Sequence, residues 1–138
     1  MDGKKEVYPT MRMKMRGKHN IENIMAAIVC ARPYGAKPET IQKVIENFPG
    51  LEHHLEFVRK RGGVEFFNDS KATNVDSVYW ALDSLSGNII WIAGGLDKGN
   101  DHTAIQDLVR TKVKAIVALG KKNEAILTAF RDVVERVY

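Results

Sequence analysis

The stretch Phe67-Asn68-Asp69-Ser70-Lys71-Ala72-Thr73-Asn74 decides how the rest of the sequence can fold. A largely apolar run at 64–67 leads directly into its polar residues, and apolar residues at helical spacing follow between 75 and 82. This order predicts a strand, a polar turn and a helix. In open α/β sheets, ligands bind beyond the carboxyl ends of the strands, where the N–H groups of the next helix attract anions. The stretch therefore predicts a ligand-binding turn.

Downstream of this turn, predicted helices and strands alternate. The patterns predict helices at 74–84, 103–110 and 123–130, strands at 89–93 and 115–119, and a final apolar pair at 133–134. Such alternation is typical of an α/β fold with a mostly parallel sheet and flanking helices. Polar or glycine-rich turns follow three strands, at 68–71, 94–99 and 120–123. We expect all three turns at one edge of the sheet.

The first half of the sequence has a different pattern. Met11, Met13 and Met15 are spaced two apart, which predicts a strand over 6–16. A helix is predicted to follow, with Asn20 as its N-cap, and a second helix from Pro38 to Pro49-Gly50. Two short apolar runs, 55–59 and 64–67, predict a β-hairpin. We place a domain boundary near 48–52, which gives domains of residues 1–48 and 49–138.

Composition limits the classes of partner. The chain has 138 residues, and its 21 Lys and Arg against 17 Asp and Glu give a formal net charge of +4. The excess is mild and dispersed, which favours small anionic ligands over nucleic acid. No segment approaches the roughly 20 apolar residues of a membrane span. Charged residues follow Met1 in place of an apolar signal core. We expect a cytoplasmic protein without a membrane partner.

The sequence does not predict a metal site. Cys30 is the only cysteine, so neither an intramolecular disulfide nor a thiolate cluster can form. The apolar residues around Cys30 predict a buried, reduced thiol. His53 and His54 are adjacent, and adjacent residues of a strand point to opposite faces. No carboxylate lies at a ligating spacing from them.

The polar turn offers groups for an anionic or sugar-containing ligand. Asp69 can accept hydrogen bonds from a ribose diol, and Lys71 supplies a positive charge for a phosphate or carboxylate. Thr73 or Asn74 can instead cap the following helix, which would explain one or two of these residues without a ligand.

Two further groups are candidates. Lys98 stands in the turn from Gly94 to Gly99, whose glycines allow a ligand to approach the backbone; a plain glycine turn with a solvated lysine is the alternative. The sequence contains neither a Walker phosphate loop nor the Gly-x-Gly-x-x-Gly fingerprint. Asn20 and Asn23 lie one helical turn apart, so both amides can face one base edge.

Three motifs together resemble the Mur ligase family. They are the stretch at 67–74, Ile-Ala-Gly-Gly-Leu-Asp-Lys-Gly at 92–99 and Gly-Lys-His-Asn-Ile-Glu-Asn at 17–23. Within the family, Asp-Ser-Lys-Ala-Thr-Asn resembles the members that add D-glutamate. The resemblance covers nearly the whole sequence. It implies that residues 1–48 end the central ATP-binding domain and that 49–138 form most of a Rossmann-like C-terminal domain, truncated at its end.

The resemblance also implies an activity. The members that add D-glutamate use ATP to form a carbon–nitrogen bond in peptidoglycan synthesis: the γ-phosphate activates the carboxylate of UDP-N-acetylmuramoyl-L-alanine, and the amine of D-glutamate attacks the acyl phosphate. It implies a monomeric parent enzyme that needs ATP and Mg²⁺. The P-loop, the UDP-binding domain and the metal ligands would lie outside these residues, so we expect the 138 residues alone to be inactive.

The resemblance assigns roles to single residues. Asn20 and Asn23 would approach the adenine and Asp69 the ribose. Lys71, Thr73 and Lys98 would meet the D-glutamate carboxylates and the reacting centre.

One position departs from the family pattern. Family members commonly read His-Arg where this sequence has His53-His54, and that arginine faces ATP. His54 lacks the guanidinium fork and is largely neutral at pH 7, so it is either a lineage variant or a weaker nucleotide clamp.

Two alternative functions remain open. One is a non-catalytic α/β module that binds an anionic metabolite. The other is another amide ligase, such as a folylpolyglutamate synthase, although the string at 69–74 argues against it.

Overall fold

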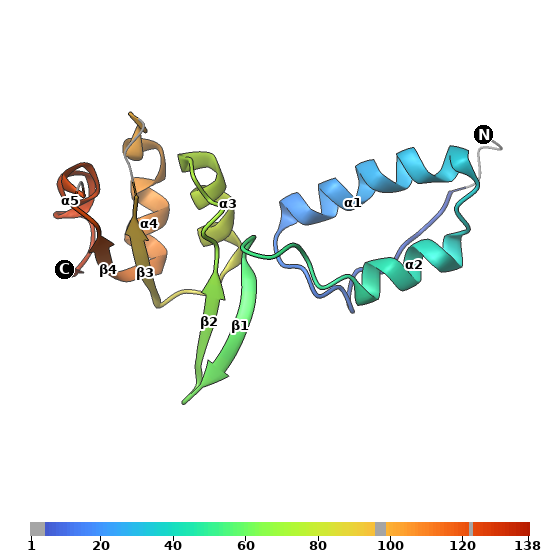
Figure 1. Ribbon diagram of the computed structural model, residues 1–138, viewed down its shortest axis with the longest axis horizontal. Helices are drawn as coiled ribbons and strands as arrows, with labels where there is room; N and C mark the ends of the chain where they lie inside the picture. The colour runs from blue at the N-terminus through green and yellow to red at the C-terminus, as the bar shows by residue number, and fades with distance from the viewer. Residues whose placement is uncertain (1–4, 96–98, 122) are drawn as a thin grey trace. The chain divides into compact units, whose positions relative to one another are not determined.

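The fold is taken from a computed structural model, which describes residues 5–95, 99–121 and 123–138. The protein divides into two compact units, residues 1–68 and 69–138, and each is described by itself (Figure 1). By contacts, the segment at 49–68 therefore groups with the residues before it. The predicted boundary near 48–52 separates two domains of the longer family members. The division by contacts does not test it, so it stays a prediction. None of the helices in the described ranges is long and apolar enough to cross a membrane.

Two helices form the body of the first unit. α1 (Lys18–Ala31) is followed by the short 3-10 helix η1 (Arg32–Tyr34) and by α2 (Pro38–Asn47). Pro38 lies in the first turn of α2, as predicted, where a missing N–H costs nothing. α2 buries Ile41 and Ile45, whereas α1 buries no residue fully. Cys30 on α1 is exposed for this reason, so its predicted burial is wrong.

The predicted strand at 6–16 is also wrong, because residues 5–17 contain no strand. The Met13 N–H donates to the Thr10 carbonyl at 3.0 Å and makes a turn there. Pro9 has no N–H to donate, and Met11 is 97% exposed. A spacing of two gives a strand only where a neighbouring strand takes up the backbone hydrogen bonds. No strand that the structure describes does so here.

α1 begins at Lys18, three residues earlier than a helix capped by Asn20 would. Its N-cap is Gly17, whose φ of 97° suits a residue without a Cβ. The Asn20 side chain is not the cap. Its Nδ2 donates instead to the Arg16 carbonyl oxygen at 2.6 Å, back toward the segment that enters the helix.

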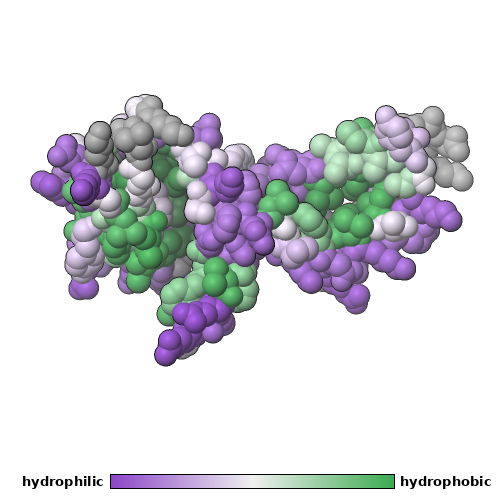
Figure 2. Space-filling model, viewed as in Figure 1, coloured by the Kyte–Doolittle hydropathy of each residue, from purple (hydrophilic) through white to green (hydrophobic). Residues whose placement is uncertain are grey.

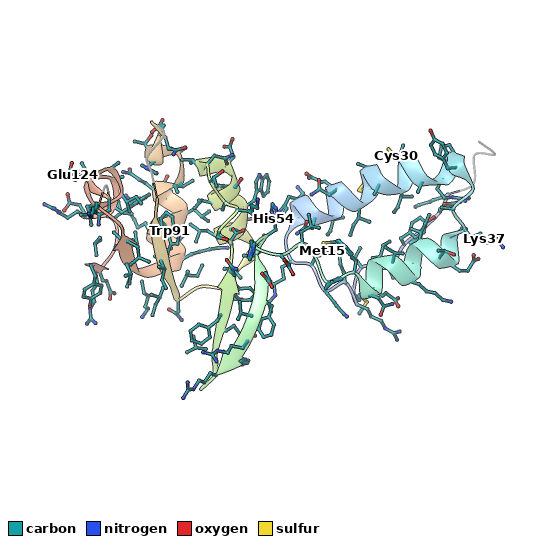
Figure 3. The ribbon with its side chains drawn as sticks, viewed as in Figure 1. Met15, Cys30, Lys37, His54, Trp91 and Glu124 are labelled. Atoms are coloured by element: carbon teal, nitrogen blue, oxygen red, sulfur yellow. The ribbon has the colours of Figure 1, made fainter. Side chains whose placement is uncertain are left out.

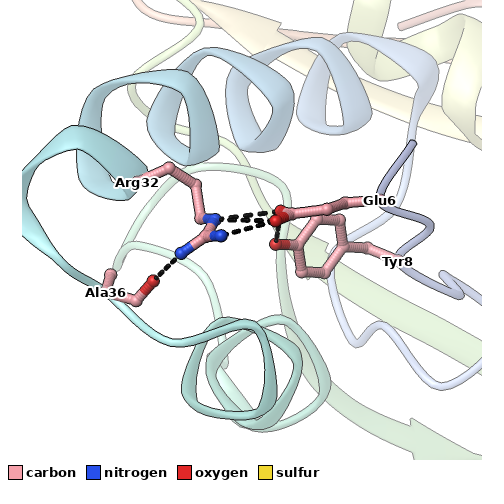
Figure 4. Close-up of polar contacts among 4 residues, drawn as sticks. All are labelled: Glu6, Tyr8, Arg32 and Ala36. Atoms are coloured by element: carbon pink, nitrogen blue, oxygen red, sulfur yellow. Dashed lines mark hydrogen bonds and ion pairs between the residues drawn. The ribbon is translucent and has the colours of Figure 1, made fainter. Parts of the chain in front are cut away.

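An ion pair holds the extended segment before α1 (Figure 4). Nε of Arg32 donates to the two carboxylate oxygens of Glu6 at 3.1 and 2.9 Å, and Nη1 of Arg32 donates to the Ala36 carbonyl at 2.6 Å. The Tyr8 hydroxyl donates to Glu6 at 2.6 Å. The hydrogen bond from Arg32, followed by that from Tyr8, lowers the pKa of Glu6. The bond to Glu6 raises the pKa of Tyr8.

The predicted hairpin is confirmed. β1 (Glu56–Arg61) and β2 (Val64–Asn68) pair antiparallel around Gly62-Gly63, whose φ values of 56° and 83° suit a two-residue turn. Arg16 pairs with Glu65 at 3.2 Å and lies 4.9 Å from the centroid of the Phe67 ring, which ties the hairpin to the segment before α1.

β2 was predicted to join the parallel sheet, and this is wrong for the described residues. It pairs with β1 alone, in a sheet of its own. The tight glycine turn supplies an antiparallel partner directly, so β2 has its hydrogen bonds without the other strands.

The second unit is a three-stranded parallel sheet in the order β3-β4-β5, with β3 (Ile89–Gly94), β4 (Val113–Leu119) and β5 (Arg136–Val137). α3 (Val75–Ser84) precedes it. The 3-10 helix η2 (His102–Ile105) and α4 (Gln106–Lys112) connect β3 to β4, and α5 (Glu124–Phe130) connects β4 to β5. The predicted α/β fold with a mostly parallel sheet and flanking helices is confirmed. The pair at 133–134 precedes the last strand rather than forming it.

The core of this unit lies between the sheet and all three of its α-helices. Ile105, Val109, Ile116 and Phe130 are its most deeply buried side chains. The Phe130 ring meets the ring of Trp91 edge to face, with centroids 5.5 Å apart. Leu82 from α3 completes the same cluster. The helices therefore cover one face of the sheet, the face that carries Trp91 and Ile116.

Lys112 joins two of these helices at their ends. Its Nζ, at the end of α4, donates to the carbonyl oxygens of Leu82, Asp83 and Leu85 at 3.0, 2.6 and 3.0 Å. The last carbonyls of a helix have no partner within the helix and carry the negative end of its dipole. The ammonium group thus satisfies the C-terminus of α3 and fixes it against the end of α4.

We predict that Lys112→Met lowers the free energy of unfolding by about 2 kcal/mol, because the hydrogen bonds from a charged donor to three carbonyl oxygens are lost. Urea denaturation followed by tryptophan fluorescence measures this, since Trp91 reports on the core of the second unit. Lys114→Met is the matched control, because Lys114 is exposed. Equal stability of the two variants would contradict the capping role.

We predict that Glu6→Gln removes a pH-dependent part of the stability. The pKa of Glu6 is lower in the folded protein than in the unfolded state, where it is about 4.3. The ion pair therefore stabilises the protein fully above that value and is lost as the pH falls through the lowered pKa. The urea midpoints of the two proteins should differ most near pH 7, and the difference should shrink as the pH falls through the lowered pKa of Glu6. A difference that grows toward low pH is the opposite outcome.

Candidate functional site

The polar turn before α3 is held by its own backbone. The Ala72 N–H donates to the Asp69 carbonyl at 2.9 Å, and the Thr73 N–H donates to the Lys71 carbonyl at 2.8 Å. These bonds fold residues 69–73 tightly onto the start of the helix. Asp69 is half-buried, whereas Lys71 and Thr73 are exposed. The turn therefore presents a cation and a hydroxyl to solvent.

Asn74, and not Thr73, caps α3. The Asn74 Oδ1 accepts a hydrogen bond from the Ser77 N–H at 2.8 Å. This geometry is that of an N-cap, which satisfies one of the free N–H groups of the first turn. Capping thus explains Asn74 and leaves the side chains of Lys71 and Thr73 unexplained by the structure of the helix.

The direction of α3 places this turn at the carboxyl edge of the parallel sheet. Lys112, which binds the end of α3, is followed directly by Val113, the first residue of β4. The end of α3 therefore lies where β4 begins. α3 has 10 residues, a length of about 15 Å, and it packs beside α4. Its start consequently lies toward the edge where β3 and β4 end (Figure 1).

Glycines shape the same edge at the ends of β3 and β4. A Cβ on Gly94 would lie 2.3 Å from the carbonyl oxygen of Leu119, so only glycine lets the two strand ends approach this closely. Gly95 and Gly120 follow with φ of 116° and 101°. The turns after β3 and β4 share one edge, as predicted. Lys98, the predicted second cation, lies outside the described residues.

Lys121 is a residue to which sequence reasoning assigned no role. It is exposed and follows Gly120 in the turn after β4. Its place after a parallel strand was the signal that marked the turn without singling out the lysine.

The predicted adenine residues lie in the first unit. Asn20 and Asn23 are in the first two turns of α1, where Asn23 is exposed and Asn20 is half-buried with its amide bonded to Arg16. Asn20 therefore has its carbonyl oxygen, but not its whole amide group, available for another partner.

His53 and His54 lie in a turn before β1. They were predicted to lie in a strand with their side chains on opposite faces, and this prediction is wrong. His53 has a φ of 66°, and its Nδ1 lies 2.8 Å from Nδ2 of Asn68. The His54 N–H donates to the Leu51 carbonyl at 3.2 Å, and His54 is exposed (Figure 3). Within residues 5–95, 99–121 and 123–138 no three His, Cys, Asp or Glu side chains form a group that could hold a metal ion.

The carboxylate of Asp101, which follows β3 in the sequence, has hydrogen-bond partners within the protein. It accepts hydrogen bonds from the Thr103 hydroxyl at 2.6 Å and the Thr103 N–H at 3.0 Å. These two bonds lower the pKa of Asp101, the hydroxyl contributing most. Asp101 thus caps η2 and is accounted for without a ligand.

A protein-family model matches more than half of the chain. The model described as "Mur ligase, glutamate ligase domain" matches residues 53–138. The chain belongs to the Mur ligase family. The match includes the polar turn, the glycine edge and the whole parallel sheet.

Curated Mur ligases agree with this assignment. The chain is 53% identical over 114 residues to the UDP-N-acetylmuramoylalanine--D-glutamate ligase of Bdellovibrio bacteriovorus, a match that covers 83% of this chain and 25% of that protein. It is 40% identical over 136 residues to the protein of the same name from Syntrophus aciditrophicus, covering 99% of this chain and 30% of that one. The chain therefore spans between a quarter and a third of the length of these relatives.

Solved structures of Mur ligases share the fold. MurF from Acinetobacter baumannii matches with a TM-score of 0.70 at 25% identity, over 91% of this chain and 29% of that one. MurC from Thermotoga maritima matches with a TM-score of 0.68 at 14% identity, over 91% of this chain and 30% of that one. The second likeness bears on the fold alone.

Proposed function

We propose that this protein is the C-terminal part of an ATP-dependent ligase that joins D-glutamate to UDP-N-acetylmuramoyl-L-alanine in peptidoglycan biosynthesis. Relatives named for D-glutamate ligation, with identities of 53% and 40%, support it. The observation that carries the proposal is that the residues of the turn at 69–74 have different structural roles. Asn74 caps α3, and Lys71 and Thr73 stay exposed at the carboxyl edge.

This reaction depends more on the positioning of its substrates than on acid–base catalysis by the protein. ATP supplies the phosphoryl group that activates the carboxylate of the UDP-sugar peptide. The D-glutamate amine then attacks the activated carbonyl carbon, the new C–N bond forms, phosphate leaves with the electron pair of its C–O bond, and the amine loses a proton. Holding the amine near the carbonyl and neutralising the anions around it are the two tasks left to the protein.

The turn at 69–74 meets the second task in this proposal. D-glutamate carries two carboxylates, and the Lys71 ammonium group would pair with one of them or with the developing charge at the reacting centre. The Thr73 hydroxyl would donate one hydrogen bond to the same amino acid. Lys98 is proposed as the second cation, because it follows the β3 segment in the sequence.

We propose the nucleotide contacts from the family pattern. Asn20 and Asn23 would meet the adenine, and the Asp69 carboxylate would accept hydrogen bonds from the ribose diol. His54 would contribute less than an arginine at its position, because its exposed imidazole lacks the guanidinium fork that binds phosphate oxygens. The described residues do not offer a Mg²⁺ site, so no step is assigned to a metal held by them.

The proposal also covers the location, the oligomeric state and the partners of the parent enzyme. ATP and a UDP-linked sugar are its small-molecule substrates, so we propose a cytoplasmic enzyme, acting as a monomer, without a nucleic-acid or membrane partner. The other functions that the sequence left open, a binding module or a folylpolyglutamate synthase, have less support, since the relatives above are named for D-glutamate ligation.

In the parent enzyme, Lys71→Met should lower kcat/KM for D-glutamate by about 100-fold, because a hydrogen bond from a charged donor is worth about 1.5–3 kcal/mol. Thr73→Val should lower it about 5-fold, as expected for a neutral hydrogen bond. Phosphate release at varied D-glutamate measures both.

Lys114→Met, which removes an exposed charge from β4, is the control and should leave the kinetics unchanged. If Lys71→Met leaves kcat/KM for D-glutamate within 2-fold (about 0.4 kcal/mol) of the unchanged enzyme, the turn does not bind the amino acid.

We further predict that the 138 residues alone neither hydrolyse ATP nor form product, because the sequence has no phosphate loop. A coupled assay for ADP and chromatography of the UDP-peptide test this. Sustained turnover by the isolated 138 residues would refute it.

A further inference from the structure

The hairpin of β1 and β2 has a free edge along β1. Among the strands that the structure describes, β1 pairs with β2 alone, so the backbone groups on its other side meet no further strand. This side of the hairpin, residues 56–61, is the β1 edge. An unpaired edge is a template on which another extended segment can add a strand, and a second copy of the same protein can supply that segment.

Basic residues are concentrated on the β1 edge. Arg59, Lys60 and Arg61 follow one another, and all three are exposed. β2 contains one charged residue, Glu65, so a strand of this hairpin does not need consecutive charges in order to pair. Figure 2 shows hydrophilic residues at the turn end of the hairpin. The run of charge in β1 therefore needs a reason other than the pairing with β2.

Contacts within the hairpin account for little of this charge. The Nζ of Lys60 lies 3.6 Å from the Glu65 carboxylate on the surface, where an ion pair contributes little to stability. The Arg59 guanidinium lies 5.7 Å from the centroid of the Phe66 ring, near the limit of a cation–π contact. Arg61 has neither an ion pair nor a hydrogen bond with the side chains in the described part of the chain.

The basic residues also lie away from the candidate site. In the register of the hairpin, Arg61 is opposite Val64, beside the glycine turn, whereas Asn68 at the other end of β2 leads into the turn at 69–74. The strand from Val64 to Asn68 is about 13 Å long. Binding of the substrates at the polar turn therefore does not explain the charge on the β1 edge.

A β-bulge makes the same edge irregular. Phe57 pairs with Phe67 and Arg59 pairs with Phe66, so Val58 has no partner in β2. A bulge bends its strand and increases the local twist. Natural sheets use bulges and charged side chains to keep a free edge from pairing with another molecule. β1 has both features.

We propose that Arg59 and Arg61, together with the bulge at Val58, prevent the β1 edge from pairing with the β1 edge of a second copy. In an antiparallel pair centred on Lys60, Arg59 of one copy would lie opposite Arg61 of the other, with Cβ atoms about 4.5–5.5 Å apart. Like charges directly opposite each other destabilise such a pair. The inference rests on the geometry of the hairpin and does not depend on the proposed ligase activity.

Self-association of the parent ligase tests the proposal. Arg59→Thr combined with Arg61→Thr removes two charges and introduces residues that favour strands. Lys37→Thr with Lys114→Thr is the matched control, because both lysines are exposed and the pair removes the same charge outside the hairpin. Arg59→Glu with Arg61→Glu restores the repulsion between copies with the opposite sign. Light scattering over a concentration series measures association, and the urea midpoint and ligase turnover check folding.

The proposal predicts that the Thr pair self-associates at a concentration about tenfold lower than the unchanged ligase, because two repulsive cross-strand pairs are lost. The control and the Glu pair should behave like the unchanged ligase. If the Thr pair associates no more readily than the unchanged ligase, the arginines do not protect the edge and the proposal is overturned.

Two other outcomes also overturn it. Equal association of the control would assign the effect to net charge, and equal association of the Glu pair would show that repulsion between copies is not the cause. If the Thr pair has a lower urea midpoint, Arg59→Gln with Arg61→Gln, which keeps long polar side chains, replaces it and is judged by the same outcomes.

Discussion

The ammonium group of Lys112 fixes the arrangement on which the candidate site depends. It binds three carbonyl oxygens at the end of α3 and is itself followed by the first residue of β4. The last carbonyls of a helix carry the negative end of its dipole, which favours a cation. The contact sets the direction of α3 against the sheet. The turn at 69–74 consequently lies at the carboxyl edge, although β2, which leads into it, belongs to another sheet.

Features set by local chemistry were predictable from the sequence. Asn74 caps α3, Pro38 opens α2, and Gly62-Gly63 closes the hairpin, because each depends on the conformational preference of one or two residues. The parallel sheet was predictable as well, because strands that alternate with helices along the sequence favour parallel pairing. The polar turn was identified because its polar residues stand between a predicted strand and a predicted helix, where ligands bind in α/β folds.

Features set by tertiary contacts were not predictable. The methionines at 11, 13 and 15 have the spacing of a strand but no strand beside them among the described residues. Cys30 lies in an apolar run whose helix has no fully buried face. The role of Lys112 was invisible, since its partners are about 30 residues away and are backbone atoms. In each case the missing information was which segment packs against which.

The edge and the faces of the sheet have separate tasks in this account. The carboxyl edge presents the exposed side chains of Lys71 and Thr73, one face of the sheet holds the core, and the other face carries the exposed side chains of Ile90, Ile92 and Leu119. The central claim is that the edge receives D-glutamate. The most direct test is a screen of the parent enzyme with ATP, UDP-N-acetylmuramoyl-L-alanine and D-glutamate, L-glutamate or a diamino acid in turn, with the amide product quantified. The account predicts product with D-glutamate and none above background with the others; a preference for L-glutamate or a diamino acid would contradict it.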